Sequence, residues 1–98
     1  MIQIKFKNQR YLTSGVNSKV GLPLQLFMWQ LIDELDGEKD YLQVFKFSSY
    51  DGKQKIEHYQ DEPEYKKEYL LCAGTLFVCK IFVIDDGQYS VMMLAEEY

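Results

Sequence analysis

Two Asp-Gly pairs constrain the fold of this chain more than any other feature. Asp51-Gly52 and Asp86-Gly87 each separate two segments in which apolar and polar residues alternate, or in which apolar residues run together. An Asp-Gly pair in this setting is typical of a tight β-hairpin, because both central positions of the turn need positive backbone φ angles. We therefore expect a mostly antiparallel sheet built around two hairpins.

The residues on either side of these turns predict the strands. The first hairpin is expected to join residues 41–47 to residues 53–60, and the second to join residues 75–84 to residues 88–95. Residues 75–84 are apolar on both faces except for Lys80, which is typical of a central strand. Alternating residues 2–7 (Ile2, Ile4 and Phe6 against Gln3, Lys5 and Lys7) indicate a further half-buried strand. Residues 64–71 fit either a short helix or a strand.

One principal helix is predicted over residues 22–36. Its apolar residues recur at helical spacing and are Leu24, Phe27, Met28, Leu31, Ile32 and Leu35. Pro23 suits the first turn of a helix, and Gly37 suits the left-handed residue that ends one. Residues 13–17 are expected to form a turn-rich loop. The fold class is therefore α+β: a single domain over residues 1–98, with a small sheet of about five or six strands and one principal helix packed on it.

Charge is distributed unevenly along the 98 residues. The net charge is −4, but the first twenty residues carry Lys5, Lys7, Arg10, Lys19 and no acid. The acids gather at the predicted helix end, turns and C-terminus: Asp33, Glu34, Asp36, Glu38, Asp40, Asp61, Glu62, Glu64, Asp85, Asp86, Glu96 and Glu97. Acids that met on one face could imitate backbone phosphates and dock on the basic groove of a DNA-handling protein. Alternatively, they only keep turns and ends soluble.

The sequence gives less support for a catalytic, metal or cofactor site. A thiol-dependent enzyme or regulator would pair Cys79 or Cys72 with His58, the one histidine. The cysteine spacing fits no common zinc site, and no phosphate loop or dinucleotide motif is present, so no catalytic residue, metal or cofactor is predicted.

Nucleic-acid binding is a further alternative. A weak binding site would use the basic and aromatic residues near the N-terminus, Lys5, Lys7, Arg10 and Tyr11. A pI of about 4.9 is far below that of a typical nucleic-acid binder, so direct binding is not the favoured prediction.

The sequence also bears on location and assembly. The longest stretch without a charge, residues 20–32, is too short to span a membrane, and no signal sequence opens the chain. Together with only two cysteines, this predicts a cytoplasmic protein. An open sheet has edge strands, so a homodimer is a further expectation that the sequence leaves open.

Several segments together resemble one bacterial family. They are residues 15–17 (GVN), 22–35 (LPLQLFMWQLIDEL), 41–45 (YLQVF), 56–60 (IEHYQ), 63–65 (PEY) and 84–98. Over roughly residues 9–98 the chain is similar to the staphylococcal domain of unknown function 960, with Asp61 where that pattern has glutamate. The resemblance implies no catalytic or binding residues. It implies bacterial, cytoplasmic proteins, often carried on mobile genetic cassettes beside recombinase or replication genes.

Taken together, these observations predict a non-enzymatic protein-interaction module. Its partner is unknown, and the acidic clusters and the genetic context that the resemblance implies favour a DNA-handling protein.

Overall fold

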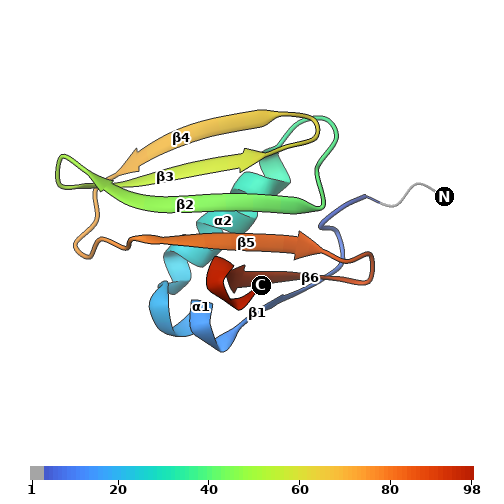
Figure 1. The fold of residues 1–98 in the computed structure, drawn as a ribbon, viewed down its shortest axis with the longest axis horizontal. Helices are drawn as coiled ribbons and strands as arrows, with labels where there is room; N and C mark the ends of the chain where they lie inside the picture. The colour runs from blue at the N-terminus through green and yellow to red at the C-terminus, as the bar shows by residue number, and fades with distance from the viewer. Residues whose placement is uncertain (1–3) are drawn as a thin grey trace.

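The computed structural model describes residues 4–98 as one six-stranded sheet with helices on it (Figure 1). The elements in chain order are β1 (Gln9–Leu12), α1 (Ser14–Lys19), α2 (Leu22–Glu34), β2 (Leu42–Tyr50), β3 (Lys53–Gln60), β4 (Tyr65–Leu71), β5 (Cys79–Asp85), β6 (Tyr89–Leu94) and the short 3-10 helix η1 (Ala95–Glu97). The strand order is β1-β6-β5-β2-β3-β4, and only β1 and β6 pair in parallel. The predicted α+β fold, mostly antiparallel with one main helix, is confirmed.

Both predicted hairpins are present. Asp51 and Gly52 have φ angles of 53° and 75° in the β2–β3 turn, and Gly87 has a φ of 102° in the β5–β6 turn. The Asp86 carboxylate stabilises the second turn by accepting hydrogen bonds from the backbone N–H groups of Gln88 (2.9 Å) and Tyr89 (3.1 Å). The first turn has the expected positive φ at both Asp51 and Gly52, whereas in the second turn only Gly87 has a positive φ and Asp86 precedes it, with its N–H donating to the Tyr89 carbonyl (3.1 Å).

Residues 64–71 and the start of β5 differ most from the sequence expectations. The ambiguous residues 64–71 form strand β4, which pairs with β3 along its whole length. Strand β5 starts at Cys79, later than predicted, because the Gln54 side chain takes the place of a strand partner at Phe77. Its Nε2 donates to the Phe77 carbonyl (3.0 Å), and its Oε1 accepts from the Phe77 N–H (2.7 Å).

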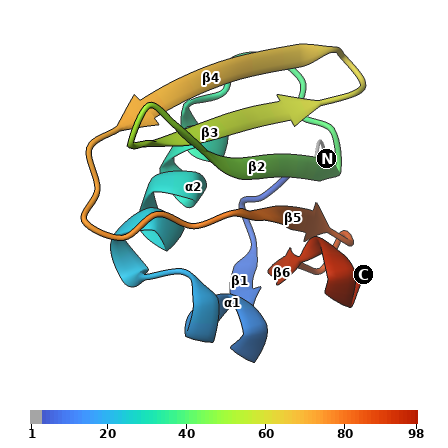
Figure 2. The ribbon, with the colours of Figure 1, turned by 60° about the vertical axis from the view of Figure 1, so that its left-hand side comes forward.

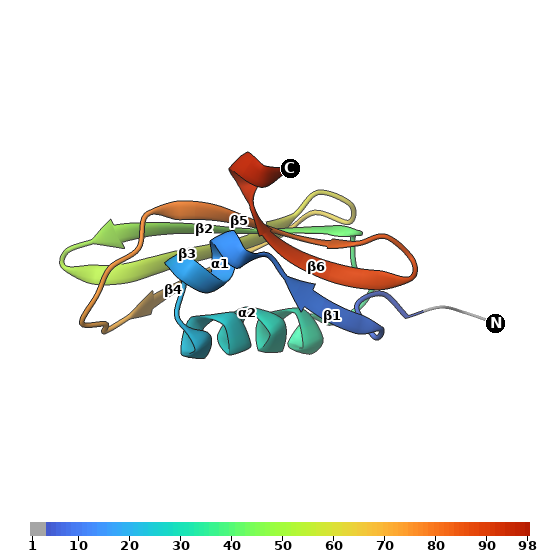
Figure 3. The same cartoon turned by 90° about the horizontal axis from the view of Figure 1, so that it is seen from below.

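Helix α2 covers one face of the sheet, and the hydrophobic core lies between them (Figure 3). Met28 and Ile32 of the helix are fully buried in the same core cluster as Phe45 and Ile81 of the sheet. The helix ends at Glu34, slightly before the predicted end, and Gly37 (φ 80°) lies in the following loop. The polar side chain of Gln25 is also buried on this helix, where its Nε2 donates to the Val20 carbonyl (2.7 Å).

The N-terminal segment is where the sequence prediction was wrong. Residues 4–8 form a turn with Phe6 at a φ of 66°, and the first strand is β1; Ile2 lies outside the described residues. Phe6 is fully buried, and its N–H donates to a carboxylate oxygen of Asp85 (2.6 Å), which anchors the turn at the end of β5. The expected loop at residues 13–17 is instead the start of α1, capped by the Thr13 hydroxyl, which accepts from the Val16 N–H (3.2 Å).

Candidate functional site

Three of the four predicted acidic clusters meet at one end of the sheet. Strand β2 begins where β3 and β5 end, since Leu42 pairs with Ile84 and Val44 with Tyr59. The α2–β2 connection, the β3–β4 turn and the β5–β6 turn therefore lie together, at the right of Figure 1. The fourth cluster lies elsewhere: Glu97 in η1 accepts a hydrogen bond from the Thr13 hydroxyl (2.7 Å) beside α1.

Some of these acids hold the fold together. Asp85 is buried and accepts from the Phe6 N–H, from Asn8 Nδ2 (3.1 Å) and from the Gly87 N–H (2.7 Å). Asp40 accepts from the backbone N–H groups of Leu42 (3.3 Å) and Glu62 (3.0 Å). Asp86 stabilises its own turn, and the two N–H groups that it accepts lower the pKa of its carboxyl. These carboxylates are engaged within the molecule.

The remaining acids at this end are exposed, and we call them the acidic end: Glu34, Asp36, Glu38, Asp61, Glu62 and Glu64. Apart from Glu34, the last residue of α2, they lie on two loops that the buried side chain of Gln60 joins. Its Oε1 accepts from the Asp40 N–H (3.0 Å), while its Nε2 donates to the carbonyls of Glu38 (3.3 Å) and Pro63 (2.7 Å). These hydrogen bonds hold the two loops of the acidic end in a fixed position relative to each other.

The structure does not join the four N-terminal residues into a nucleic-acid surface. Arg10 lies over the Trp29 ring (4.6 Å), donates to the Phe6 carbonyl (2.9 Å) and pairs with Asp33. Lys7 also pairs with Asp33 (3.4 Å), and Lys5 lies beside Asp85 and Asp86. Tyr11 follows Arg10 on a strand, so it points to the opposite face, where it contacts the edge of Tyr89.

The pKa of the Asp33 carboxyl is affected by Arg10 and Lys7. Partial burial acts to raise its pKa, but the hydrogen bond and charge of Arg10, with a smaller effect of Lys7, outweigh burial and hold the pKa below its usual value. Asp33 and Arg10 thus neutralise each other, and neither is free for a partner.

His58 and the cysteines are also apart. The imidazole is fully buried, stacks on Phe45 (4.3 Å between ring centres) and shares a 2.7 Å hydrogen bond with Gln43 Oε1. Burial lowers its pKa to about 4, so the ring is neutral at physiological pH. Cys79 lies two strands away, roughly 12 Å by sheet geometry, and burial raises the pKa of its thiol. Exposed Cys72 follows the end of β4.

The structure therefore does not pair either cysteine with His58 as a nucleophile and its base would be paired. A group of His, Cys, Asp and Glu side chains able to hold a metal ion is likewise not found within residues 4–98.

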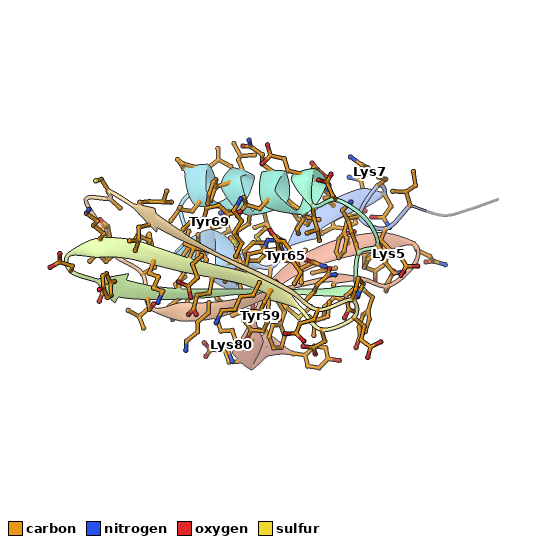
Figure 4. The ribbon with its side chains drawn as sticks, turned by 90° about the horizontal axis from the view of Figure 1, so that it is seen from above. Lys5, Lys7, Tyr59, Tyr65, Tyr69 and Lys80 are labelled. Carbon is orange, nitrogen blue, oxygen red and sulfur yellow. The ribbon has the colours of Figure 1, made fainter. Side chains whose placement is uncertain are left out.

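The face of the sheet opposite α2 is a second exposed surface. We call it the open face and define it by the outward side chains of β2–β5. Figure 4 shows Tyr59 and Lys80 on this side, while Tyr65 and Tyr69 lie between the sheet and the helix. Its charged residues are the lysines Lys46, Lys53, Lys55, Lys66 and Lys80 and the glutamates Glu57 and Glu68. The open face is therefore basic on a chain whose net charge is −4.

Lysines of the open face differ in their partners. Lys66 lies 3.1 Å from Glu57 and 3.9 Å from Glu68, and Lys55 lies 3.8 Å from Glu68. The hydrogen bond and charge of Lys66 lower the pKa of Glu57. Lys46 and Lys80 are direct cross-strand neighbours, and within residues 4–98 neither makes an ion pair. The sequence shows that each interrupts an apolar pattern, but only the strand register places them side by side.

Comparisons with known proteins agree with the fold. The model of a family described as staphylococcal protein of unknown function (DUF960) matches residues 9–97. A crystal structure of a protein of unknown function from Enterococcus faecalis is similar, with a TM-score of 0.84 and 24% identity over 100% of this chain and 98% of that one. No curated protein matches. Among the helices of residues 4–98, none has the length and hydrophobicity that crossing a bilayer requires.

Proposed function

Since the chain belongs to the DUF960 family, described as staphylococcal proteins of unknown function, we propose its role from geometry alone: it is a non-enzymatic module whose acidic end docks on a basic surface of a partner protein. The observation that carries this proposal is the convergence of separate acidic loops at one end of the sheet. Complementary charge of this kind steers encounter and fixes orientation.

A DNA-handling protein is the partner that this surface fits best. Carboxylates fixed on two joined loops can take the positions of backbone phosphates in a basic groove, because nucleic-acid binding depends mainly on contacts to phosphates. The acids that stabilise the fold, Asp33, Asp40, Asp85 and Asp86, are not part of this contact. The proposed surface is thus the acidic end rather than all twelve predicted acids.

Capture from a staphylococcal lysate, with quantitative mass spectrometry, tests this proposal. The bait is the whole chain, and the variant is Asp36→Lys/Asp61→Lys/Glu64→Lys, since none of these side chains holds a loop. The partner should be lost with this variant and should be released from the wild type by added duplex DNA. Salt of about 0.5 M should also weaken capture, because it screens exposed charges beyond about 4 Å.

The matched control compares two single variants with equal charge change. Asp61→Lys alters the acidic end, whereas Glu96→Lys alters an exposed acid of η1 away from it. Only the first should reduce capture. If the triple variant retains the same proteins as the wild type, or if DNA leaves the capture unchanged, the proposal is wrong.

A further inference from the structure

We propose that the open face binds single-stranded nucleic acid, with Lys46 and Lys80 on the phosphates and neighbouring aromatic rings against the bases. This site adjoins the acidic end, because Asp61 and Glu64 line the same pocket as Lys46 and Tyr59, but it does not depend on the role proposed for the acidic end. It also differs from the N-terminal residues that the sequence indicated, of which Lys7 and Arg10 pair with Asp33.

Charge on the open face is the first reason. Like charges directly opposite on adjacent strands destabilise a sheet, yet Lys46 and Lys80 occupy such positions. Glu57 is the other cross-strand neighbour of Lys46, but its carboxylate pairs with Lys66 at 3.1 Å. Glu57 therefore offsets the charge of Lys46 only in part, since Lys46 is one of three lysines that act on this carboxylate. Within residues 4–98 neither Lys46 nor Lys80 has a carboxylate oxygen within ion-pair distance, and an anionic ligand would supply one.

Aromatic rings beside this lysine pair are the second reason. Tyr59 and Phe82 are the two cross-strand neighbours of Val44, which lies two residues before Lys46 on the same face of β2. The ring of Tyr98 packs edge-on against that of Phe82, with 5.6 Å between the ring centres. Tyr98 is 74% exposed, so one of its faces is available. A pocket of about 340 Å³ beside Tyr59 is lined by both signs of charge, with Lys46 and Lys66 on one hand and Glu57, Asp61 and Glu64 on the other, so the phosphates are placed at the Lys46–Lys80 pair and not in this pocket. Rings next to lysines are what single-strand binding requires, since bases stack on the rings while cations follow the backbone.

The shape of the surface favours single strands over duplex DNA. Reading a duplex in its major groove requires a protruding helix or a two-stranded ribbon. The open face is instead the broad side of a sheet, and α2 lies on the other side (Figures 3 and 4). An acidic polypeptide would satisfy the lysines but would leave the rings unexplained. The low pI that argued against nucleic-acid binding describes the whole chain, whereas this face is locally basic.

Fluorescence anisotropy with labelled oligothymidylate of about 16 nucleotides, at about 50 mM salt, tests the proposal. We expect saturable binding by the wild type that weakens as salt rises. The Lys46→Gln/Lys80→Gln variant should bind about tenfold more weakly. The magnitude of its slope of log K against log salt concentration should decrease by about 1.4, because each of the two lost lysine–phosphate contacts contributes about 0.7. Tyr98→Leu should weaken binding while leaving that slope unchanged.

The control variant Lys19→Gln/Lys39→Gln removes the same charge from α1 and from the α2–β2 connection, away from the open face. It should bind almost as the wild type does. Loss of affinity equal to that of Lys46→Gln/Lys80→Gln would overturn the proposal, as would equal affinity for a duplex. Tighter binding of polyglutamate than of oligothymidylate would assign the face to an acidic protein instead. Saturation of the face by a second copy, seen as concentration-dependent association by light scattering, would also overturn it.

Discussion

The two faces of the same strands are built in opposite ways. Within β2, Phe45 and Phe47 are buried beneath α2, while Lys46 between them points into solvent. The covered face holds the apolar side chains whose burial stabilises the fold. The open face carries lysines and half-exposed rings that contribute less to stability. The contrast indicates that folding depends mainly on the covered face.

The polar groups of the two faces also differ. On the covered face, buried glutamine side chains are bonded: Gln43 Nε2 donates to Gln60 Oε1 (2.6 Å), and Gln43 Oε1 meets His58 Nε2. A buried polar group without a partner costs about 1–3 kcal/mol, so these amides must satisfy one another. The single buried side-chain nitrogen or oxygen without a partner in residues 4–98 is His58 Nδ1. On the open face, water forms hydrogen bonds with the lysine ammonium groups, so these groups need no partner within the protein.

The largest expected effect compares one phenylalanine from each face. Phe45→Ala should lower the free energy of unfolding by about 3–5 kcal/mol, because it leaves a cavity under α2. Phe82→Ala should cost about 1–2 kcal/mol, because Phe82 is only partly buried and its ring meets Tyr98 edge-on at the surface. Urea denaturation of both variants measures the difference. Equal losses would show that the open face is as important for folding as the covered one.

The next effect is a pH dependence that comes from the covered face. The unfolded chain protonates His58 near pH 6.5, whereas the folded chain keeps it neutral until about pH 4. The unfolded state therefore binds more protons in this interval, so stability is complete above pH 6.5 and decreases as pH falls. Between pH 6.5 and 5 the loss should be about 2 kcal/mol, at 1.36 kcal/mol per pH unit.

The matched variant His58→Leu should remove this dependence over the same interval, whatever its stability at neutral pH. Carboxyl groups protonate mainly below pH 5, so the interval isolates the histidine. Urea midpoints of the wild type at several pH values measure the slope. A flat profile for the wild type would mean that the buried imidazole accepts a proton without cost.

These contrasts also show what the sequence could and could not predict. The hairpins and α2 were predictable because their signals are local: Asp-Gly turns and apolar residues at helical spacing. The N-terminal turn was not, since burial of Phe6 depends on Asp85, which lies far along the chain. Buried Gln25 and Gln43 look solvent-facing in any polarity pattern, and only their partners explain them.

The candidate sites follow the same division. The acidic clusters were visible in the sequence, but their convergence depends on which strand ends meet. The basic N-terminus was visible too, yet its pairing with Asp33 of α2 was not. The open face was missed because its lysines are spread over four strands, and no sequence window contains the Lys46–Lys80 pair.

The smallest expected effect returns to that pair. Lys80→Glu should raise the free energy of unfolding by about 0.5 kcal/mol, because it replaces a repulsive cross-strand pair with an attractive one. Lys53→Glu, whose cross-strand neighbour is Tyr50, is the control and should change stability little. If Lys80 is kept for a ligand, Lys80→Glu will fold more stably and bind oligothymidylate more weakly, whereas a structural lysine would lose stability. Thermal melts and anisotropy on the same two variants distinguish these outcomes, because opposite changes in stability and affinity are what a residue retained for binding produces.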